Sequence, residues 1–285
     1  MTISRPEYKF EWLPLVEKAL SLWYLETRTE NEHGEAPFKM KAIVTVILLL
    51  LVAPLTLHGG EFRVTPIRLD FDVRAKSGVV TVVNEGDERL NLQMRASEWT
   101  QDAEGKDVYN ETNDLIFFPR LMTLDKKEER VIRVGIKIPA TTKEKTYRLF
   151  IEEIPGARKA EGASVAIAIR FGVPIFAKPV KEDVRGEIEK MELSGGSFNL
   201  LLKNRGNAHF IVQSIHLKGR NHAGQDVFSK ELAGWYLLSG VSRLYSTSIP
   251  PETCRELGTL EVEIKTDRFA LSRKLDVHEA MCTPY

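Results

Sequence analysis

Residues 165–176 read VAIAIRFGVPIF, and every second position in this stretch carries a large apolar side chain. Side chains of a β-strand point alternately to opposite faces, so the period of two predicts a strand with one apolar face. Pro174 cannot donate a main-chain hydrogen bond, and proline is expected in edge strands or near strand ends. The stretch therefore predicts an apolar strand at a sheet edge, a position that invites pairing with another chain.

Short strands of the same kind follow one another along most of the chain. Turn residues separate seven such runs, and the last of them contains the stretch quoted above. The runs are FRVTPIRLDF, GVVTVVNEG, RLNLQMRASEW, LIFFP, ERVIRVGIKIP, TYRLFIEEIP and SVAIAIRFGVPIF. Such a density of strands is typical of an immunoglobulin-like sandwich. A second series follows Pro179: GSFNLLLKN, AHFIVQSIHLKG, QDVFSKEL, SRLYSTSIP, TLEVEIKTD and FALSRKLDV. We predict an all-β chain with two tandem immunoglobulin-like β-sandwich domains, at residues 61–178 and 179–285.

The composition fits a globular protein and excludes one kind of partner. The chain has 285 residues, with 40 basic and 40 acidic side chains and 43% hydrophobic residues. This balance gives no sign of disorder and no basic excess of the kind found in nucleic-acid-binding proteins. We therefore expect no nucleic-acid partner.

No pattern in the sequence indicates an enzyme. His209, His216 and His222 are not spaced like zinc ligands, and the cysteines lie far downstream. The nucleophile motifs G-x-S-x-G and S-x-x-K are both missing from the sequence. Glu152 and Glu153 are neighbours on one predicted strand and point to opposite faces, so they cannot act together. We expect no catalytic site, no metal site and no cofactor.

Residues 40–60, MKAIVTVILLLLVAPLTLHGG, stand out as hydrophobic. Lys39 and Lys41 precede an apolar run of 11 residues, which is too short for a membrane-spanning helix of about 20 residues. The order of charge, apolar run and small residues is typical of a secretory signal peptide, with a buried core helix or a signal anchor as alternatives. We expect export, cleavage and no stable membrane insertion afterwards.

The position of this segment bears on the start of the protein. A signal peptide begins its protein, so Met40 is expected to be the true start. Residues 1–39 are then a non-native upstream extension of the reading frame. Within them FEWLPLVEKALSLWYL has some helical periodicity, so an amphipathic helix is the alternative.

Cys254 and Cys282 are the two cysteines of the chain. In an oxidising compartment two cysteines of one domain commonly pair. This disulfide would close a loop of about 27 residues, which on the chain-entropy description contributes roughly 3 kcal/mol to stability. Two buried free thiols are the alternative.

Several of these stretches resemble the periplasmic pilus-assembly chaperones of the chaperone–usher pathway. TYRLFIEEIP, a loop and SVAIAIRFGVPIFAKP resemble the F strand, loop, G strand and interdomain linker of that family, and VTPIRLDF resembles its first strand. NEGDERLNLQMRASEW and LMTLDKKEERVIRV resemble its B–C region and the segment before its E strand. KNRGNAHFIV is similar to a stretch of the archaic-type branch, and the resemblance covers residues 62–277.

The resemblance implies a function for the apolar edge strand. Chaperones of this family lend their G strand to a pilin subunit that lacks its own last strand, and they deliver the subunit to an outer-membrane usher. The donor positions implied here are Val165, Ile167, Ile169 and Phe171. A strand buried in the chaperone's own core is the alternative. The resemblance also implies a periplasmic protein of a Gram-negative cell, with pilin subunits and an usher as partners.

An alternative function from another class is a secreted two-domain immunoglobulin-like pilus subunit or adhesin. Such a subunit would carry an N-terminal donor extension of alternating apolar residues directly after the signal peptide. Residues 61–68 are too short for that role and are interrupted by Pro66. The sequence therefore favours the chaperone.

Family members anchor the carboxylate at the subunit's C-terminus with an arginine on the first strand and a lysine on the G strand. Arg68 matches the arginine, whereas Pro174 stands at the position of the lysine. The candidates for the second cation are Arg95, Arg148 and Arg170. Their spacing does not choose among them. A structural role for Arg68, in an ion pair with Asp70 or Asp72, is the alternative.

Two further positions match an ion pair that joins the two domains in this family. They are Glu144 and Lys178. A surface pair of this kind contributes less than about 1 kcal/mol to stability.

Overall fold

The computed structural model describes residues 62–155 and 168–283. The predicted upstream extension, the predicted signal peptide and the predicted donor positions Val165 and Ile167 lie outside the described residues. The described residues all belong to one compact unit, Gly59–Tyr285. Among them, no helix combines the length and the hydropathy that crossing a membrane requires.

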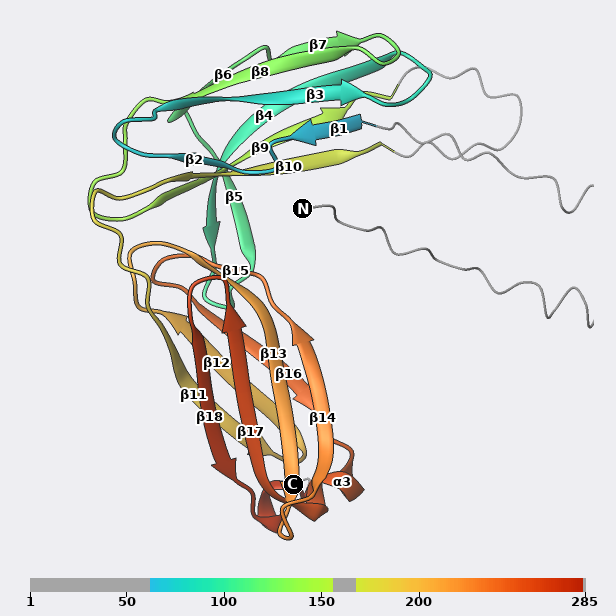
Figure 1. Cartoon of the computed structure of the whole chain (residues 1–285), viewed down its shortest axis with the longest axis vertical. Coiled ribbons are helices and arrows are strands. Elements are labelled where there is room, and N and C mark those ends of the chain that lie inside the picture. Colours follow the sequence, from blue (N-terminus) through green and yellow to red (C-terminus); the bar gives the residue numbers. More distant parts are fainter. Residues whose placement is uncertain (1–61, 156–167, 284–285) are drawn as a thin grey trace, which may run out of the picture. The chain divides into compact units, whose positions relative to one another are not determined.

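The first half of this unit is a β-sandwich (Figure 1). One sheet has the order β1-β3-β8-β6 and contains β1 (Phe62–Thr65), β3 (Ser77–Asn84), β8 (Glu129–Ile136) and β6 (Leu115–Phe118). The other has the order β2-β10-β9-β4-β5, with β7 paired to β4. Its strands are β2 (Leu69–Phe71), β10 (Arg170–Ala177), β9 (Lys145–Glu153), β4 (Leu90–Gln101), β5 (Asp107–Glu111) and β7 (Leu121–Leu124). Pro66, which follows a cis peptide bond, separates β1 from β2, and the chain changes sheets there.

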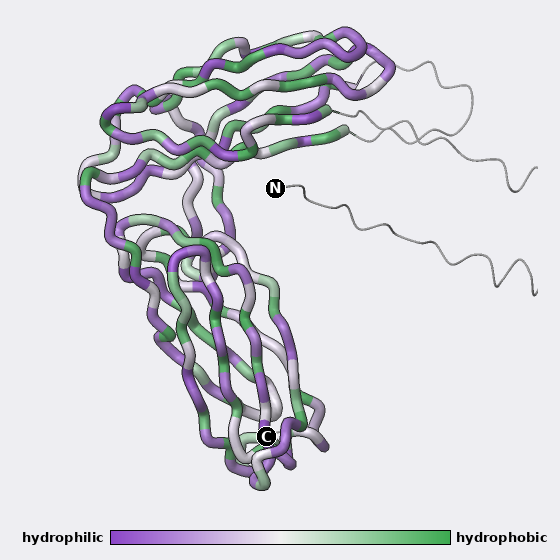
Figure 2. The backbone as a smooth tube through the Cα atoms, viewed as in Figure 1, coloured by the Kyte–Doolittle hydropathy of each residue, from purple (hydrophilic) through white to green (hydrophobic). Residues whose placement is uncertain are grey.

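The alternation of apolar and polar residues explains these strands (Figure 2). Along β3, Val80 and Val82 are fully buried, while Val79, which precedes them, is 42% exposed. Along β8, Ile132 and Val134 are buried in the same way. The buried side chains of the two sheets form one hydrophobic core, as in other two-layer sandwiches.

The second half is a separate sandwich with its own core. Its three-stranded sheet contains β11 (Gly186–Ser194), β12 (Ser197–Asn204) and β16 (Ser242–Ser248). Its larger sheet contains β14 (Asp226–Ala233), β13 (Phe210–Asn221), β17 (Leu257–Thr266) and β18 (Ala270–Asp276), with β15 (Tyr236–Leu237) paired to β13. The short helices are α3 (Pro251–Glu256) and η1 (Glu279–Met281). The prediction of an all-β chain with two immunoglobulin-like sandwiches is therefore confirmed.

The two cysteines lie in the second sandwich and form a disulfide. Cys254 belongs to α3 and Cys282 follows η1, and both are buried in the second core. The bond ties the last described turn of the chain to the segment before β17. On the chain-entropy description it contributes roughly 3 kcal/mol to stability.

A buried asparagine occupies the same place in each sandwich. Asn84 ends β3 and Asn204 ends β12. The Asn204 amide donates to the carbonyl oxygens of Ala208 and Leu237, both at 2.9 Å, and its oxygen accepts from the Gly206 N–H at 2.8 Å. Asn84 makes bonds of the same kind in the first sandwich. Each asparagine therefore ties main-chain groups of its loop to the sandwich.

Replacing Asn204 with alanine should lower the free energy of unfolding by roughly 2–4 kcal/mol, because buried main-chain groups lose their partners. Urea denaturation measures this change. Asn110→Ala is a suitable control because Asn110 is exposed, and it should change stability by less than about 0.5 kcal/mol. An Asn204→Ala variant as stable as the parent would show that other groups satisfy those main-chain atoms.

Candidate functional site

The strand β10 has one edge that is only partly covered (Figure 1). On one side β9 pairs with it along its whole length, residues 170–177. On the other side β2 pairs only with residues 175–177. Within the described part of the chain, no strand therefore covers the outer side of residues 170–174, which we call the open edge.

The hydrogen-bond pattern shows which groups the open edge presents. The Glu153 N–H donates to the Ile169 carbonyl at 2.9 Å, so Ile169 faces β9. In an antiparallel ladder, residues alternate between facing the partner strand and facing away from it. The main-chain groups of Arg170, Gly172 and Pro174 therefore face outward. Because the missing N–H of Pro174 lies on that outer side, this proline costs β10 no bond to β9.

The apolar face of β10 divides into a buried half and a more exposed half. Val173 and Ile175 are fully buried in the first core. Phe171 is partly buried and packs against the same core, whereas Ile169 is 36% exposed. Ile169 and Phe171, the two predicted donor positions that the structure describes, thus lie at the end where β10 leaves the core.

Arg68 lies beside the C-terminal half of β10. Its Nε and Nη2 donate to the two carboxylate oxygens of Asp70, at 2.8 and 2.7 Å. Its guanidinium carbon lies 4.8 Å from the centre of the Phe176 ring. A guanidinium has a second pair of parallel donors, formed by Nη1 and the remaining Nη2 hydrogen. The ion pair with Asp70 is therefore present, and it leaves this second fork available for another carboxylate.

Arg68 and Asp70 each stabilise the charged form of the other. Partial burial alone would raise the pKa of Asp70, but the hydrogen bonds and charge of Arg68, together with the charge of Lys178, hold it below its usual value. The pKa of Arg68 is raised, because the hydrogen bond and charge of Asp70 outweigh the opposite effect of burial. The carboxylate of Asp70 therefore stabilises the fold above its ordinary pKa, and this contribution is lost as the pH falls through the lowered value.

Arg148 is directly opposite Pro174 in the pairing of β9 with β10. Its Nη1 donates to the Gly172 carbonyl at 3.0 Å, and its guanidinium carbon lies 3.9 Å from the centre of the Trp99 ring. The residue is only 7% exposed, and its buried Nε has no hydrogen-bond partner among the described residues. The charged guanidinium of Arg148 therefore lies against the Gly172 carbonyl, which faces the open edge.

The other two candidate cations are already paired. Arg170 lies 2.8 Å from Glu152 and its guanidinium stacks over the Phe150 ring at 3.8 Å. Arg95 lies 3.7 Å from the same carboxylate. In the described part of the molecule, Arg148 alone of the three has no carboxylate within ion-pair distance.

The prediction of an ion pair between Glu144 and Lys178 is wrong, because each residue has another partner. Glu144 is buried, and its Oε2 instead accepts from the His209 main-chain N–H at 2.8 Å and lies 2.8 Å from His209 Nδ1. Lys178 lies 3.6 Å from Asp70. A buried carboxylate needs close hydrogen-bond partners, and the loop before β13 supplies them. In the sequence, His209 is a candidate only for metal binding, and no local pattern indicates this role.

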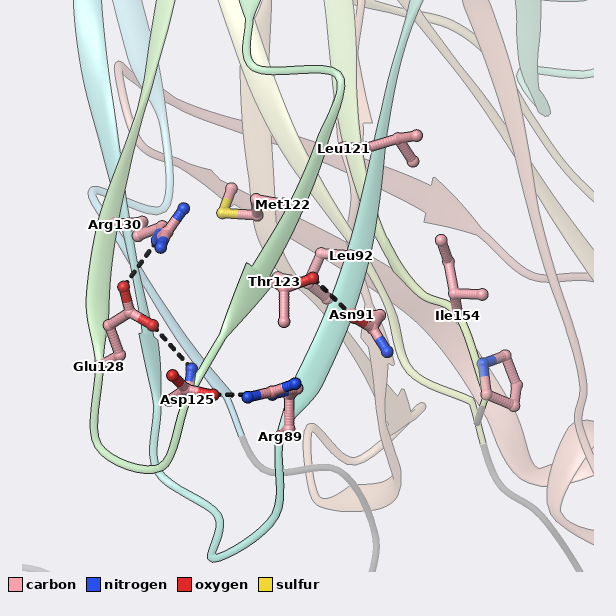
Figure 3. Close-up of a pocket in the computed structure, with 11 residues that line it drawn as sticks. Arg89, Asn91, Leu92, Leu121, Met122, Thr123, Asp125, Glu128, Arg130 and Ile154 are labelled. Atoms are coloured by element: carbon pink, nitrogen blue, oxygen red, sulfur yellow. Dashed lines mark hydrogen bonds and ion pairs between the residues drawn. The ribbon is translucent and has the colours of Figure 1, made fainter. Parts of the chain in front are cut away.

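A separate hollow of about 540 Å³ lies at the start of β4 (Figure 3). Its polar side chains pair with one another: Arg89 with Asp125, Glu128 with Arg130 and Thr123 with Asn91, each at 2.7 Å. Its charges are therefore matched within the hollow, and we do not assign it a ligand.

The described residues form two immunoglobulin-like sandwiches in tandem, and the first of them has an open edge. Residues 61–182 match the family described as "Pili and flagellar-assembly chaperone, PapD N-terminal domain". The match covers the first sandwich and the first residues after it.

Individual proteins are similar to longer stretches of the chain. "Chaperone protein FanE" of Escherichia coli is 22% identical over 186 residues, which cover 64% of this chain and 78% of the relative. A chain in the complex of CsuC and CsuE, a chaperone and tip adhesion subunit of the archaic Csu pili of Acinetobacter baumannii, aligns with a TM-score of 0.52 and 18% identity. That alignment covers 74% of this chain and 97% of the other. The YadV chaperone aligns with a TM-score of 0.51 and 14% identity, over 76% of this chain and 99% of the other.

Proposed function

We propose that this protein is a pilus-assembly chaperone that binds a subunit by adding β10 and the residues before it to the subunit's incomplete sheet. The observation that carries this function is the open edge, where an apolar strand presents main-chain groups that no described strand pairs. Main-chain hydrogen bonds would join the two edges, while Val165, Ile167, Ile169 and Phe171 would fill the subunit's groove. The protein has no catalytic part in this process.

The carboxylate at the subunit's C-terminus would be held by two arginines. Arg68 would contribute its second fork, with Asp70 holding the guanidinium in place. Among the three candidates for the second cation, we assign Arg148, because it has no carboxylate partner among the described residues and donates to an outward-facing carbonyl. In this arrangement the charge missing at Pro174 comes from the neighbouring strand β9.

The same contacts would end the added strand. The Gly172 carbonyl is occupied by Arg148, and Pro174 has no N–H to offer. A strand that pairs with the open edge therefore runs out of partners at Gly172, beside Arg148. The subunit's chain would end there with its carboxylate on the two guanidinium groups.

We further propose that the protein works in the periplasm after cleavage of the segment at residues 40–60, and that it passes its subunits to an outer-membrane usher. The disulfide between Cys254 and Cys282 supports an oxidising compartment.

Isolation of the tagged chain from the periplasm, followed by mass spectrometry of the bound proteins, tests this function. We expect a soluble one-to-one complex with a pilin-like subunit. Recovery of the chain in a polymer of identical or related subunits would instead identify it as a pilus component. Recovery without any subunit, from cells that express the pilus, would contradict the proposal.

A further inference from the structure

The loop before β13 in the second sandwich packs closely against the first sandwich and the connecting segment. The Glu144 N–H donates to the Asn207 carbonyl at 2.9 Å, and the Asn207 side chain donates to the Thr142 carbonyl at 2.8 Å. A side chain at Gly206 would place its Cβ 2.2 Å from the Asp183 carbonyl oxygen, so only glycine allows this approach. These contacts fix the main chain that carries His209.

The ring of His209 is held in one orientation. Glu144 Oε2 contacts both the main-chain nitrogen and Nδ1 of this residue at 2.8 Å. The imidazole and the Phe176 ring are stacked, with centres 3.7 Å apart and planes inclined by 13°. Phe176 is fully buried and His209 is 3% exposed, so neither ring has room to turn away.

Phe176 connects this stack to the arginine of the proposed site. It pairs with Asp70 in the register of β10 and β2, and the Arg68 guanidinium lies 4.8 Å from the centre of its ring. Arg68 is thus held by two contacts, its ion pair with Asp70 and its cation–π contact with Phe176. The ion pair fixes one edge of the guanidinium, and the aromatic ring limits the tilt of its plane.

We propose that His209 is a positioning residue for subunit binding, which acts by holding Phe176 under the Arg68 guanidinium. The second sandwich thereby contributes to the binding of the subunit's carboxylate without touching it. This inference rests on the proposed function. Two parallel hydrogen bonds to a carboxylate require a defined guanidinium plane, so a looser ring would weaken that contact.

A double-mutant cycle tests this inference with the subunit that co-purifies with the parent chain. His209→Gln removes the ring but keeps an amide N–H for Glu144, and we expect it to weaken subunit binding on the order of fivefold to tenfold. His209→Phe keeps an aromatic ring for the stack and should bind within about twofold of the parent. In an Arg68→Ala background, His209→Gln should have no further effect, because the group that it positions is gone.

Thermal unfolding of each variant separates positioning from stability, and binding is compared at a temperature at which every variant is folded. Equal losses from His209→Gln in the parent and in the Arg68→Ala background would overturn the inference, as would unchanged binding in a folded His209→Gln variant. Failure of the parent chain to capture any subunit would instead count against the proposed function, so the two failures are distinct.

Discussion

Replacing Ile167 and Ile169 together with aspartate should abolish subunit capture and leave the chain folded. Ile169 is 36% exposed and is not part of the described core, so its replacement removes little apolar burial from the free chain. In the complex, the same side chains would enter the apolar groove of the subunit. A carboxylate buried in such a groove is strongly unfavourable unless it is paired or neutralised, which predicts a complete loss of capture.

Circular dichroism of the purified variant and the amount of subunit in the periplasm measure the two parts of this prediction. Ile138→Asp is a matched control, because Ile138 is 58% exposed and lies outside β10. It should fold and should still protect the subunit. A folded double variant that still supports subunit accumulation would refute the donor positions, and an unfolded one would place this strand in the chaperone's own core.

The period of two along the strands, together with their number and the turn residues between them, predicted both sandwiches. Burial of alternate residues, such as Val80 and Val82 on β3, depends only on local strand geometry, which the sequence carries directly. The pairing of Cys254 with Cys282 needed one further premise, an oxidising compartment, and the structure contains this bond. A strand can therefore be predicted from its own alternation of residues, without knowing which strands are its neighbours.

The contacts of the candidate site depend on which strands and loops lie side by side, so they could not be predicted from one strand alone. Arg148 reaches the Gly172 carbonyl because the register of β9 and β10 sets it opposite Pro174, and register is not visible in either strand alone. Glu144 takes His209 as its partner because a loop 65 residues later in the chain approaches it. Lys178 instead lies beside Asp70, a contact that also depends on which elements are neighbours.

Replacing Arg68 with alanine should leave the thermal midpoint within a few degrees of the parent value and should greatly weaken subunit binding. The ion pair with Asp70 is about one-third exposed, so its loss has a small effect on folding. In the complex, the lost contact is a charge-assisted one with a carboxylate partly shielded from water. Its removal should cost roughly 2–5 kcal/mol of binding free energy, part of which is the penalty of an unpaired carboxylate.

Two further variants, Arg68→Lys and Arg74→Ala, show which property of Arg68 the Arg68→Ala variant loses. The lysine variant should recover only part of the affinity, because an ammonium group cannot reproduce the planar fork that grips two oxygens. Arg74→Ala removes an exposed arginine near β2 and should bind as the parent does, which controls for the change in net charge. An Arg68→Ala variant with unchanged affinity for the purified subunit would exclude the anchor.

A subunit that lacks its last residue shows whether Arg68 acts on the carboxylate. Shortening the chain withdraws the terminal carboxylate from the arginines, so Arg68→Ala should cost much less affinity for this subunit than for the complete one. The position of the carboxylate also sets the register, because a slip of one residue would turn Ile167 and Ile169 away from the groove that they fill. If Arg68→Ala weakened the binding of both subunits equally, Arg68 would act on the fold or on the docking of the strand, and the carboxylate would need another anchor.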